Sequence, residues 1–377
     1  MAVKDRLVSW FIKNVIAPGM EIIDQPGFIV LKLSDKRETT YLRELLFPED
    51  VLVELEKQIS KKYGSKGRQV LYSIGKKFGY RYASSSKYPL LKNTSEKEFL
   101  NFIYMLVRYI ETTFAKRLTH KIDIKNKTVY MTLDNFVICR QSGIGYIMTS
   151  GGVSGICAYM FCDDSIEGVE TACQGRGAKV CELICAPASI LKQKKMKFIE
   201  ETNYKNLDME TNYESMNKTQ VCQYSHESFK SMLDSGFFKY TKGVVEHNGR
   251  RFFLCESSLM YIIENELRKI PGAENTLFQI AFDFGQKVID SGNLNEKFIA
   301  DFMSSIGFGD IYITKKNKKY MVVTNFFPWM KFYDSIKFTL FRGILSGMLS
   351  KYEKIKISLD KIEKEVSGGH LTVILSQ

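Results

Sequence analysis

The chain repeats part of its own sequence, and this repeat constrains its fold more than any other feature. Residues 128–136 and 318–326 share Tyr, Met, Asn and Phe at a constant offset of 190, and both are rich in strand-forming residues. Earlier in each half, the runs that begin at Leu71 and Leu277 have helical periodicity, and each reaches a glycine with identical spacing. Matches in the same order indicate a duplicated domain.

A set of three glycines also recurs, 192 residues further along the chain: Gly151, Gly155 and Gly177 match Gly343, Gly347 and Gly369. The first two glycines of each set are four residues apart on an expected helix, so they lie on one face. Without side chains, that face lets a neighbouring backbone come close. We expect each of these helices to pack on another backbone, in the interface between the two halves.

Each half is expected to mix strands and helices in the same order. An initial strand pair comes first, at 28–33 with 39–42 and at 237–245 with 251–254, and Asn248-Gly249 is a strong hairpin turn. In the first half helices follow at 48–62, 67–83 and 95–113, then strands near 120–138, the glycine-rich helix and two closing strands. This order predicts an α+β fold, with an antiparallel sheet packed against helices in each half. The domains are residues 1–185 and 226–377, joined by a polar linker at 186–225 that is partly helical near 196–202.

Composition is that of a folded protein, since 45% of the 377 residues are hydrophobic. The net charge of +12 favours acidic partners such as nucleic acid, although lysines spread along the chain also serve solubility. Residues 1–19 carry charges and have no long apolar core, so no secretory signal is expected. The uncharged stretch 141–162 is rich in glycine and reads as a buried helix rather than a membrane span. We expect a cytoplasmic protein, since eight cysteines without a signal suggest a reducing compartment.

Six of the eight cysteines fall between residues 139 and 185, which asks for a local explanation. Glu170 and Cys173 are three residues apart, and Cys181 follows eight residues later, with Gly177 midway. This spacing predicts a β-hairpin whose turn contains Gly177 and which brings the two thiols together beside Glu170. Shared metal ligation, buried free thiols and a Cys173–Cys181 disulfide are all compatible with it.

This Glu-Cys-Cys motif, with the small-residue helix before it, resembles the end of the 4-vinyl reductase domain. The resemblance implies a fold similar to subunits of TRAPP tethering complexes and to the sensory domain of aromatic-responsive activators. In such sensors the motif helps bind structural zinc beside a pocket for an aromatic ligand. Carried over, Glu170, Cys173 and Cys181 are the expected zinc ligands.

The sequence departs from that pattern at one ligand. Zinc-binding members of the family have a further cysteine 23 residues before the glutamate, where this chain has Ile147. A closed zinc site takes four ligands. The candidates for the fourth ligand are Cys185, Cys157 and Cys139.

The second copy has lost the motif altogether. Ile362 stands in place of Glu170, Glu365 in place of Cys173, and Val373 in place of Cys181. Any zinc is therefore expected in the first module only. The second module is expected to be degenerate, and the fused pair to form a built-in pseudo-dimer.

No catalytic constellation is visible, because the four histidines are scattered and nucleophile-elbow, metalloprotease and P-loop motifs are absent. We therefore expect a non-enzymatic binding protein of archaeal type. It would hold a hydrophobic small molecule (a hydrocarbon, lipid or aromatic compound) as a sensor or carrier, with a protein partner or a second copy. The alternatives are a scaffold or tether of the TRAPP-subunit type and a basic, nucleic-acid-associated regulator.

Overall fold

The structure is a computed structural model that describes residues 20–34, 39–136, 145–205, 222–241, 244–289, 294–328, 336–368 and 370–377. The chain divides into two compact units. The motif unit comprises Leu52–Asp208 with Thr241–Val244, and it contains the Glu-Cys-Cys motif. The terminal unit comprises Met1–Val51, Met209–Tyr240 and Val245–Gln377, and so contains both ends of the chain.

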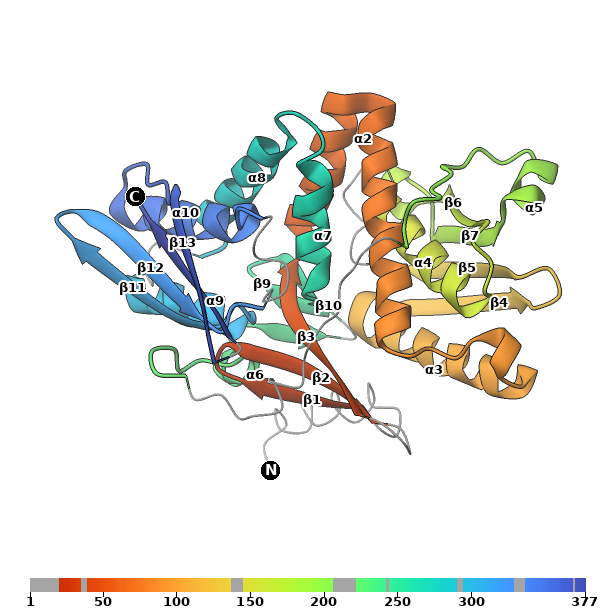
Figure 1. The fold of residues 1–377 in the computed structure, drawn as a ribbon, viewed down its shortest axis with the longest axis horizontal. Coiled ribbons are helices and arrows are strands. Elements are labelled where there is room, and N and C mark those ends of the chain that lie inside the picture. The colour runs from red at the N-terminus through yellow and green to blue at the C-terminus, as the bar shows by residue number, and fades with distance from the viewer. Residues whose placement is uncertain are drawn as a thin grey trace. The chain divides into compact units, whose positions relative to one another are not determined.

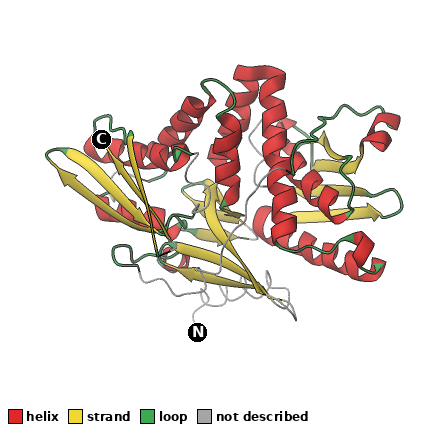
Figure 2. Ribbon diagram, in the orientation of Figure 1, coloured by secondary structure: helices red, strands yellow, loops and turns green. Residues whose placement is uncertain are grey.

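The motif unit has one four-stranded antiparallel sheet, in the order β4-β5-β7-β6, with helices packed against it (Figures 1 and 2). Its elements are α2 (Glu49–Ser85, which begins in the terminal unit), η1 (Leu91–Asn93), α3 (Glu96–Phe114), β4 (Arg117–Asp123), β5 (Thr128–Asp134), α4 (Ile147–Met160), β6 (Ile166–Ala172), η2 (Gln174–Arg176), β7 (Cys181–Pro187) and α5 (Ala188–Gln193).

The terminal unit has a six-stranded sheet, in the order β1-β2-β3-β10-β9-β8, and a four-stranded antiparallel sheet, in the order β11-β12-β14-β13. The strands are β1 (Met20–Gln25), β2 (Phe28–Ser34), β3 (Thr39–Pro48), β8 (Lys239–Thr241), β9 (Val244–His247), β10 (Arg250–Glu256), β11 (Asp310–Lys316), β12 (Lys319–Asn325), β13 (Lys361–Ser367) and β14 (His370–Ser376). The helices are α6 (Phe229–Asp234), α7 (Ser258–Leu267), α8 (Ala273–Lys287), α9 (Glu296–Ser305) and α10 (Thr339–Glu353).

The two four-stranded sheets have the same strand order, since β4, β5, β6 and β7 correspond in sequence to β11, β12, β13 and β14. Each sheet also has a glycine-bearing helix, α4 or α10, inserted at the same point of the chain. The mixed α+β class with antiparallel sheets is therefore as expected. We call residues 52–187 the first copy and residues 258–376 the second copy.

The predicted helix pair 48–62 and 67–83 is present as α2, which is interrupted by a non-helical residue at Gly64 (φ 56°, ψ −132°). Its counterparts in the second copy are the separate helices α7 and α8, with Gly272 between them at φ 79°. Positive φ favours glycine, so one glycine marks the break in each copy.

The glycine helices pack closely on a neighbouring backbone, as expected, but the neighbour belongs to the same unit. A Cβ atom on Gly155 would overlap the carbonyl oxygen of Lys76 in α2, and one on Gly347 would overlap that of Phe282 in α8. The expected location between the two halves is therefore wrong. The small residues bring two helices of one copy together.

Strands β5 and β12 occupy the same place in the two sheets, but the structure aligns them one residue away from the offset of 190 given by the sequence identities. Met131 pairs with Leu183, while the residue that pairs with the corresponding Leu375 is Val322, not Met321. The buried faces agree, because Met131 and Val322 are buried and Met321 is exposed. The structural offset is thus 191, and a one-residue slip places the matching tyrosines on opposite faces.

The initial strand pairs of the two halves join each other instead of remaining separate. Both pairs are present. In the second pair, Asn248 and Gly249 form the turn between β9 and β10, at φ 49° and 75°. However, β3 pairs with β10 along 44–48 and 252–256, so the N-terminal strands lie in the terminal unit. The domain limits at residues 185 and 226 stay a prediction.

The start of the expected linker is ordered on the motif unit. A short helix is present at Ala188–Gln193, whereas the expected helix near 196–202 is wrong, because 196–204 has no regular secondary structure. Instead, Met196 and Phe198 pack on a buried cluster that includes Ile184 and Leu191. Among the described residues, no helix is long and apolar enough to cross a membrane.

Candidate functional site

The predicted motif residues lie where β6 turns into β7. Glu170 is on β6, Cys173 directly follows that strand, and Cys181 begins β7. The turn contains Gly177 at φ 91°, as expected. Both cysteines are free thiols and are almost fully buried, and the backbone N–H of Gln174 donates to Cys181 Sγ at 3.4 Å. The hairpin therefore forms and buries both thiols at its closed end.

Glu170 faces the start of α4 rather than solvent. Its Oε2 accepts a hydrogen bond from the backbone N–H of Tyr146 at 3.0 Å, and its Oε1 forms an ion pair with Arg176. Burial raises the pKa of Glu170 to about 7, against the lowering effect of the Tyr146 hydrogen bond. A hydrogen bond with Cys173 links the carboxyl to the first thiol. Glu170 is thus a carboxyl group that changes charge near neutral pH.

The other candidate cysteines lie elsewhere. Cys157 on α4 and Cys185 on β7 form a hydrogen bond with each other. Burial raises the pKa of the Cys185 thiol well above its ordinary value, and the Cys157 hydrogen bond adds to this. Cys139 lies outside the described residues.

In the structure, the described candidate ligands have other partners. Both oxygens of Glu170 are engaged by other groups, and Cys157 and Cys185 bind each other. Among the described residues, no group of three or more His, Cys, Asp or Glu side chains could hold a metal ion. Zinc ligation by Glu170, Cys173 and Cys181 stays a prediction from the sequence.

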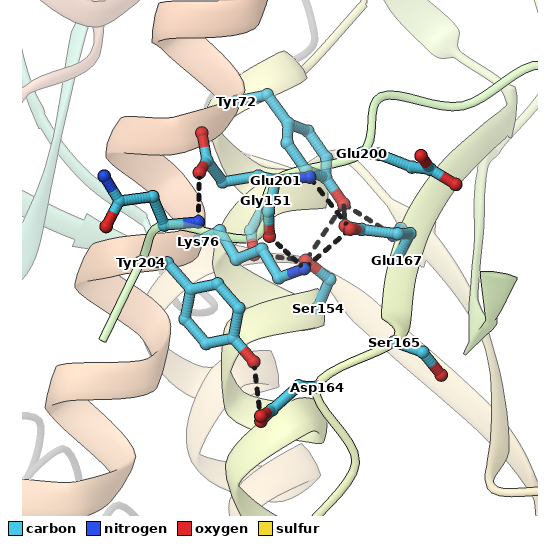
Figure 3. A network of polar contacts seen from close by, with 12 residues as sticks. Tyr72, Lys76, Gly151, Ser154, Asp164, Ser165, Glu167, Glu200, Glu201 and Tyr204 are labelled. Atoms are coloured by element: carbon cyan, nitrogen blue, oxygen red, sulfur yellow. Dashed lines mark hydrogen bonds and ion pairs between the residues drawn. The ribbon is translucent and has the colours of Figure 1, made fainter. Parts of the chain in front are cut away.

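A second cluster, which sequence reasoning missed, is formed by side chains of α2, α4 and β6 (Figure 3). Lys76 on α2 and Glu167 on β6 form an ion pair at 2.7 Å, and their side chains are 0% and 3% exposed. Burial lowers the pKa of Lys76 and raises that of Glu167, and in each case the partner's charge opposes the change. A charge pair so fully removed from water must be stabilised by further hydrogen bonds.

Tyr72 supplies part of that hydrogen bonding. Its hydroxyl donates to Glu167 Oε2 at 2.7 Å and lies 3.0 Å from Ser154 Oγ on α4. The same hydroxyl accepts the backbone N–H of Gly168 at 2.7 Å. Burial raises the pKa of Tyr72 well above its usual value, so the phenol remains neutral. Tyr72 therefore fixes one carboxylate oxygen of Glu167.

The remaining partners come from the irregular segment that follows α5 (Figure 3). Lys76 Nζ donates to the carbonyl oxygen of Glu201 at 2.9 Å, and the backbone N–H of Glu201 donates to Glu167 Oε1 at 2.9 Å. Lys76 Nζ also lies 4.5 Å from the ring centroid of Tyr204, which is 1% exposed. The Tyr204 hydroxyl donates to Asp164 Oδ1 at 3.0 Å. The ion pair thus binds both polar groups of one backbone residue.

The second copy has apolar side chains at the equivalent positions. The glycine contacts align Tyr72 and Lys76 with Phe278 and Phe282, because Gly151 meets the first pair and Gly343 the second. At the glycine offset, Leu359 corresponds to Glu167. This substitution of apolar for charged residues was the available sequence signal.

One buried carboxyl is common to both copies. Glu56 Oε1 accepts the backbone N–H of Met148 at 2.6 Å, at the start of α4. Glu264 Oε1 accepts the backbone N–H of Leu340 at 3.1 Å, at the start of α10. Burial raises the pKa of Glu56 to about 8 and that of Glu264 to about 7. Each glutamate satisfies a donor that the helix start would otherwise leave unpaired.

No protein-family model matches the sequence, and no curated protein sequence matches it. Among solved structures, the chain is similar to the phenol-responsive sensory domain of the transcription activator PoxR, crystallised with phenol. The identity is 17% and the TM-score 0.35, over 50% of this chain and 92% of that domain.

Proposed function

We propose that this chain is a non-enzymatic protein that binds a hydrophobic small molecule as a sensor or carrier. The first copy is the binding module. The second copy is its structural partner, so that the fused copies form a pseudo-dimer. The observation that carries the proposal is the chemical difference between two copies with one topology.

The features that the copies share are those the fold needs. Both keep the strand order, the close contact between helices through glycine, and the buried glutamate at the start of the glycine helix. The features found only in the first copy are Glu170, the two motif thiols and the Lys76–Glu167 pair. Since the second copy does without them, the shared fold does not require them, and we propose that Glu170 and the two motif thiols serve ligand binding.

The surroundings of Glu170 have the chemistry of a site for an apolar ligand. The rings of Tyr146 and Phe136 are buried, with centroids 6.1 Å apart, and the buried Cys173 thiol is hydrogen-bonded to Glu170. A small-molecule site is mostly apolar with a few polar groups that fix orientation. We propose that a hydroxyl group of an aromatic ligand takes the place of the partly exposed Arg176 side chain at Glu170 Oε1, while Oε2 keeps its hydrogen bond from the Tyr146 N–H. With a pKa of about 7, Glu170 can donate or accept that hydrogen bond near neutral pH.

The test is native mass spectrometry of the purified full-length protein, followed by thermal unfolding with a panel of phenols, aromatic hydrocarbons and fatty acids. We expect a bound molecule, or a rise in melting temperature with one class of compound. Hydrogen exchange should show that protection by this compound is concentrated on β6, β7 and α4.

The matched variants are Glu170→Ile, which introduces the second copy's residue, and Ile362→Val as a control in the second copy. Glu170→Ile should weaken binding and the control should not. A bare chain mass together with no response to any compound would overturn the proposal. Protection confined to the second copy would overturn the assignment of the site.

A further inference from the structure

The segment that crosses the Lys76–Glu167 pair is bound as a ligand would be. We define residues 200–205 as the latch. It contributes to no helix or strand. Gln69 Nε2 on α2 donates to the carbonyl oxygen of Glu200 at 3.0 Å. With the two bonds to Glu201, three consecutive contacts are therefore made to the latch backbone.

Few of these contacts depend on the latch sequence. Lys76 and Glu167 bind the carbonyl oxygen and the N–H of Glu201, and every residue except proline has both of these backbone groups. Side-chain recognition is concentrated at Tyr204, whose ring meets Lys76 and lies 5.1 Å from the Tyr80 ring at 71°. Asp164 then binds the Tyr204 hydroxyl and Lys205. Such a surface selects a peptide segment outside helix and strand, with an aromatic residue at one position.

The residues that the latch covers are charged, and this favours a segment that can dissociate over a permanent part of the core. An apolar surface must stay covered, because exposing it to water is costly. A lysine and a glutamate regain hydration when they are uncovered, which offsets much of the loss of their bound partner. In the second copy, Phe282 and Leu359 stand at these positions, and these apolar side chains would regain no favourable hydration on exposure.

We propose that Lys76, Glu167 and Tyr80 form a peptide-binding site, which residues 200–205 occupy in cis and can leave. The ligand class is a peptide segment that presents a free N–H and carbonyl at one residue and an aromatic residue three positions later. This site is separate from the small-molecule site proposed around Glu170, and it stands without it.

The first experiment measures binding of a fluorescent peptide with the sequence of residues 197–205 to the full-length protein. Wild type should bind the peptide weakly, because the latch competes in cis. Tyr204→Ala weakens the latch while leaving Lys76, Glu167 and Tyr80 intact, so it should bind the peptide about tenfold more tightly or better.

Two altered peptides identify the recognised groups. A peptide N-methylated at the residue equivalent to Glu201 cannot donate to Glu167, and it should bind the Tyr204→Ala protein about tenfold more weakly. A peptide with alanine in place of the tyrosine should also lose affinity. Equal binding of the N-methylated and unmodified peptides would overturn backbone recognition.

Hydrogen exchange of the wild-type protein provides the second measurement. The Glu201 amide should exchange much faster than the amides of α4, through opening of the latch alone. Exchange of the Glu201 amide only together with α4 would show that the latch is part of the core, and would overturn the proposal. Failure of the Tyr204→Ala protein to bind the unmodified peptide would overturn it as well.

Discussion

The two copies solve the same packing problem with different chemistry. In both, glycines let the inserted helix touch a second helix, and a buried glutamate binds the start of that helix. On the second helix and on the chain segment that follows the glycine helix, the first copy has Tyr72, Lys76 and Glu167, whereas the second copy has Phe278, Phe282 and Leu359. The comparison teaches that the fold tolerates either a buried ion pair or apolar side chains at these positions.

The difference extends to what lies over these positions. The ion pair of the first copy has its hydrogen bonds completed by the latch, which follows the last strand. In the second copy the backbone N–H of Leu359 donates to Ser346 Oγ at 3.2 Å, so that position is satisfied within the copy. The first copy is thus incomplete without a polypeptide segment, and the second is self-contained.

The largest effect is expected when one charge of the buried pair is removed. Lys76→Met leaves Glu167 buried without its counter-ion, which costs about 3–5 kcal/mol of unfolding free energy. The double variant Lys76→Phe/Glu167→Leu introduces the second copy's residues and should recover most of that loss. Urea denaturation monitored by circular dichroism measures both. A double variant as unstable as the single one would contradict the equivalence of the copies.

The glycine contacts should be equally important in both copies. Gly155→Ala and Gly347→Ala each place a methyl group on a backbone carbonyl oxygen, so each should cost about 3 kcal/mol or somewhat less. Gly152→Ala is the matched control, because its Cβ would meet nothing nearer than the Gly75 oxygen at 3.7 Å. That change should be neutral or stabilising, since alanine favours helix. Thermal unfolding of the three variants measures these effects. A large loss of stability for only one of Gly155→Ala and Gly347→Ala would contradict the equal importance of the glycine contacts in the two copies.

The shared glutamates predict a pH dependence common to both copies. The folded pKa values of about 8 for Glu56 and about 7 for Glu264 lie above the ordinary 4.5. Their contribution to stability is therefore complete below pH 4.5 and is lost as pH rises through the folded values. Glu56→Gln keeps an acceptor without the charge, so between pH 6 and 8 it should lose about 1–2 kcal/mol less than wild type.

Glu264→Gln should reduce the same loss over a window about one pH unit lower. Urea denaturation at a series of pH values measures the difference between each variant and wild type. Since other carboxyl groups contribute equally to both curves, they cancel in that difference. Identical pH profiles for all three proteins would show that the glutamates are ionised in the folded state.

The sequence was sufficient for features that depend on local chemistry. The Asn248-Gly249 turn follows from residues that tolerate positive φ, and the hairpin at Gly177 follows from the spacing of Cys173 and Cys181. Close helix contact follows from the glycine spacing, because the absence of a side chain has one geometric consequence.

Features that depend on tertiary contact were missed or misplaced. The sequence identities align at an offset of 190, but β12 pairs with β14 so that Val322 rather than Met321 is buried, which moves the match by one residue. A helix near 196–202 agrees with local propensity, yet Lys76 and Glu167 bind the backbone groups of Glu201 that a helix would use. Nothing in the local sequence of Lys76 reports that its partner lies 91 residues away.

The smallest effect is expected at the motif itself. Cys181→Val introduces the second copy's Val373 at a position that is 0% exposed, so a volume-conserving change should alter the unfolding free energy by less than about 1 kcal/mol. Urea denaturation with and without a chelator, together with metal analysis of the purified protein, measures this. Were zinc bound by Glu170, Cys173 and Cys181, the same variant would lose metal and much of its stability, because metal binding contributes directly to folding. A large, chelator-sensitive loss would therefore establish the zinc site, and would show that the copies differ in what holds this hairpin together.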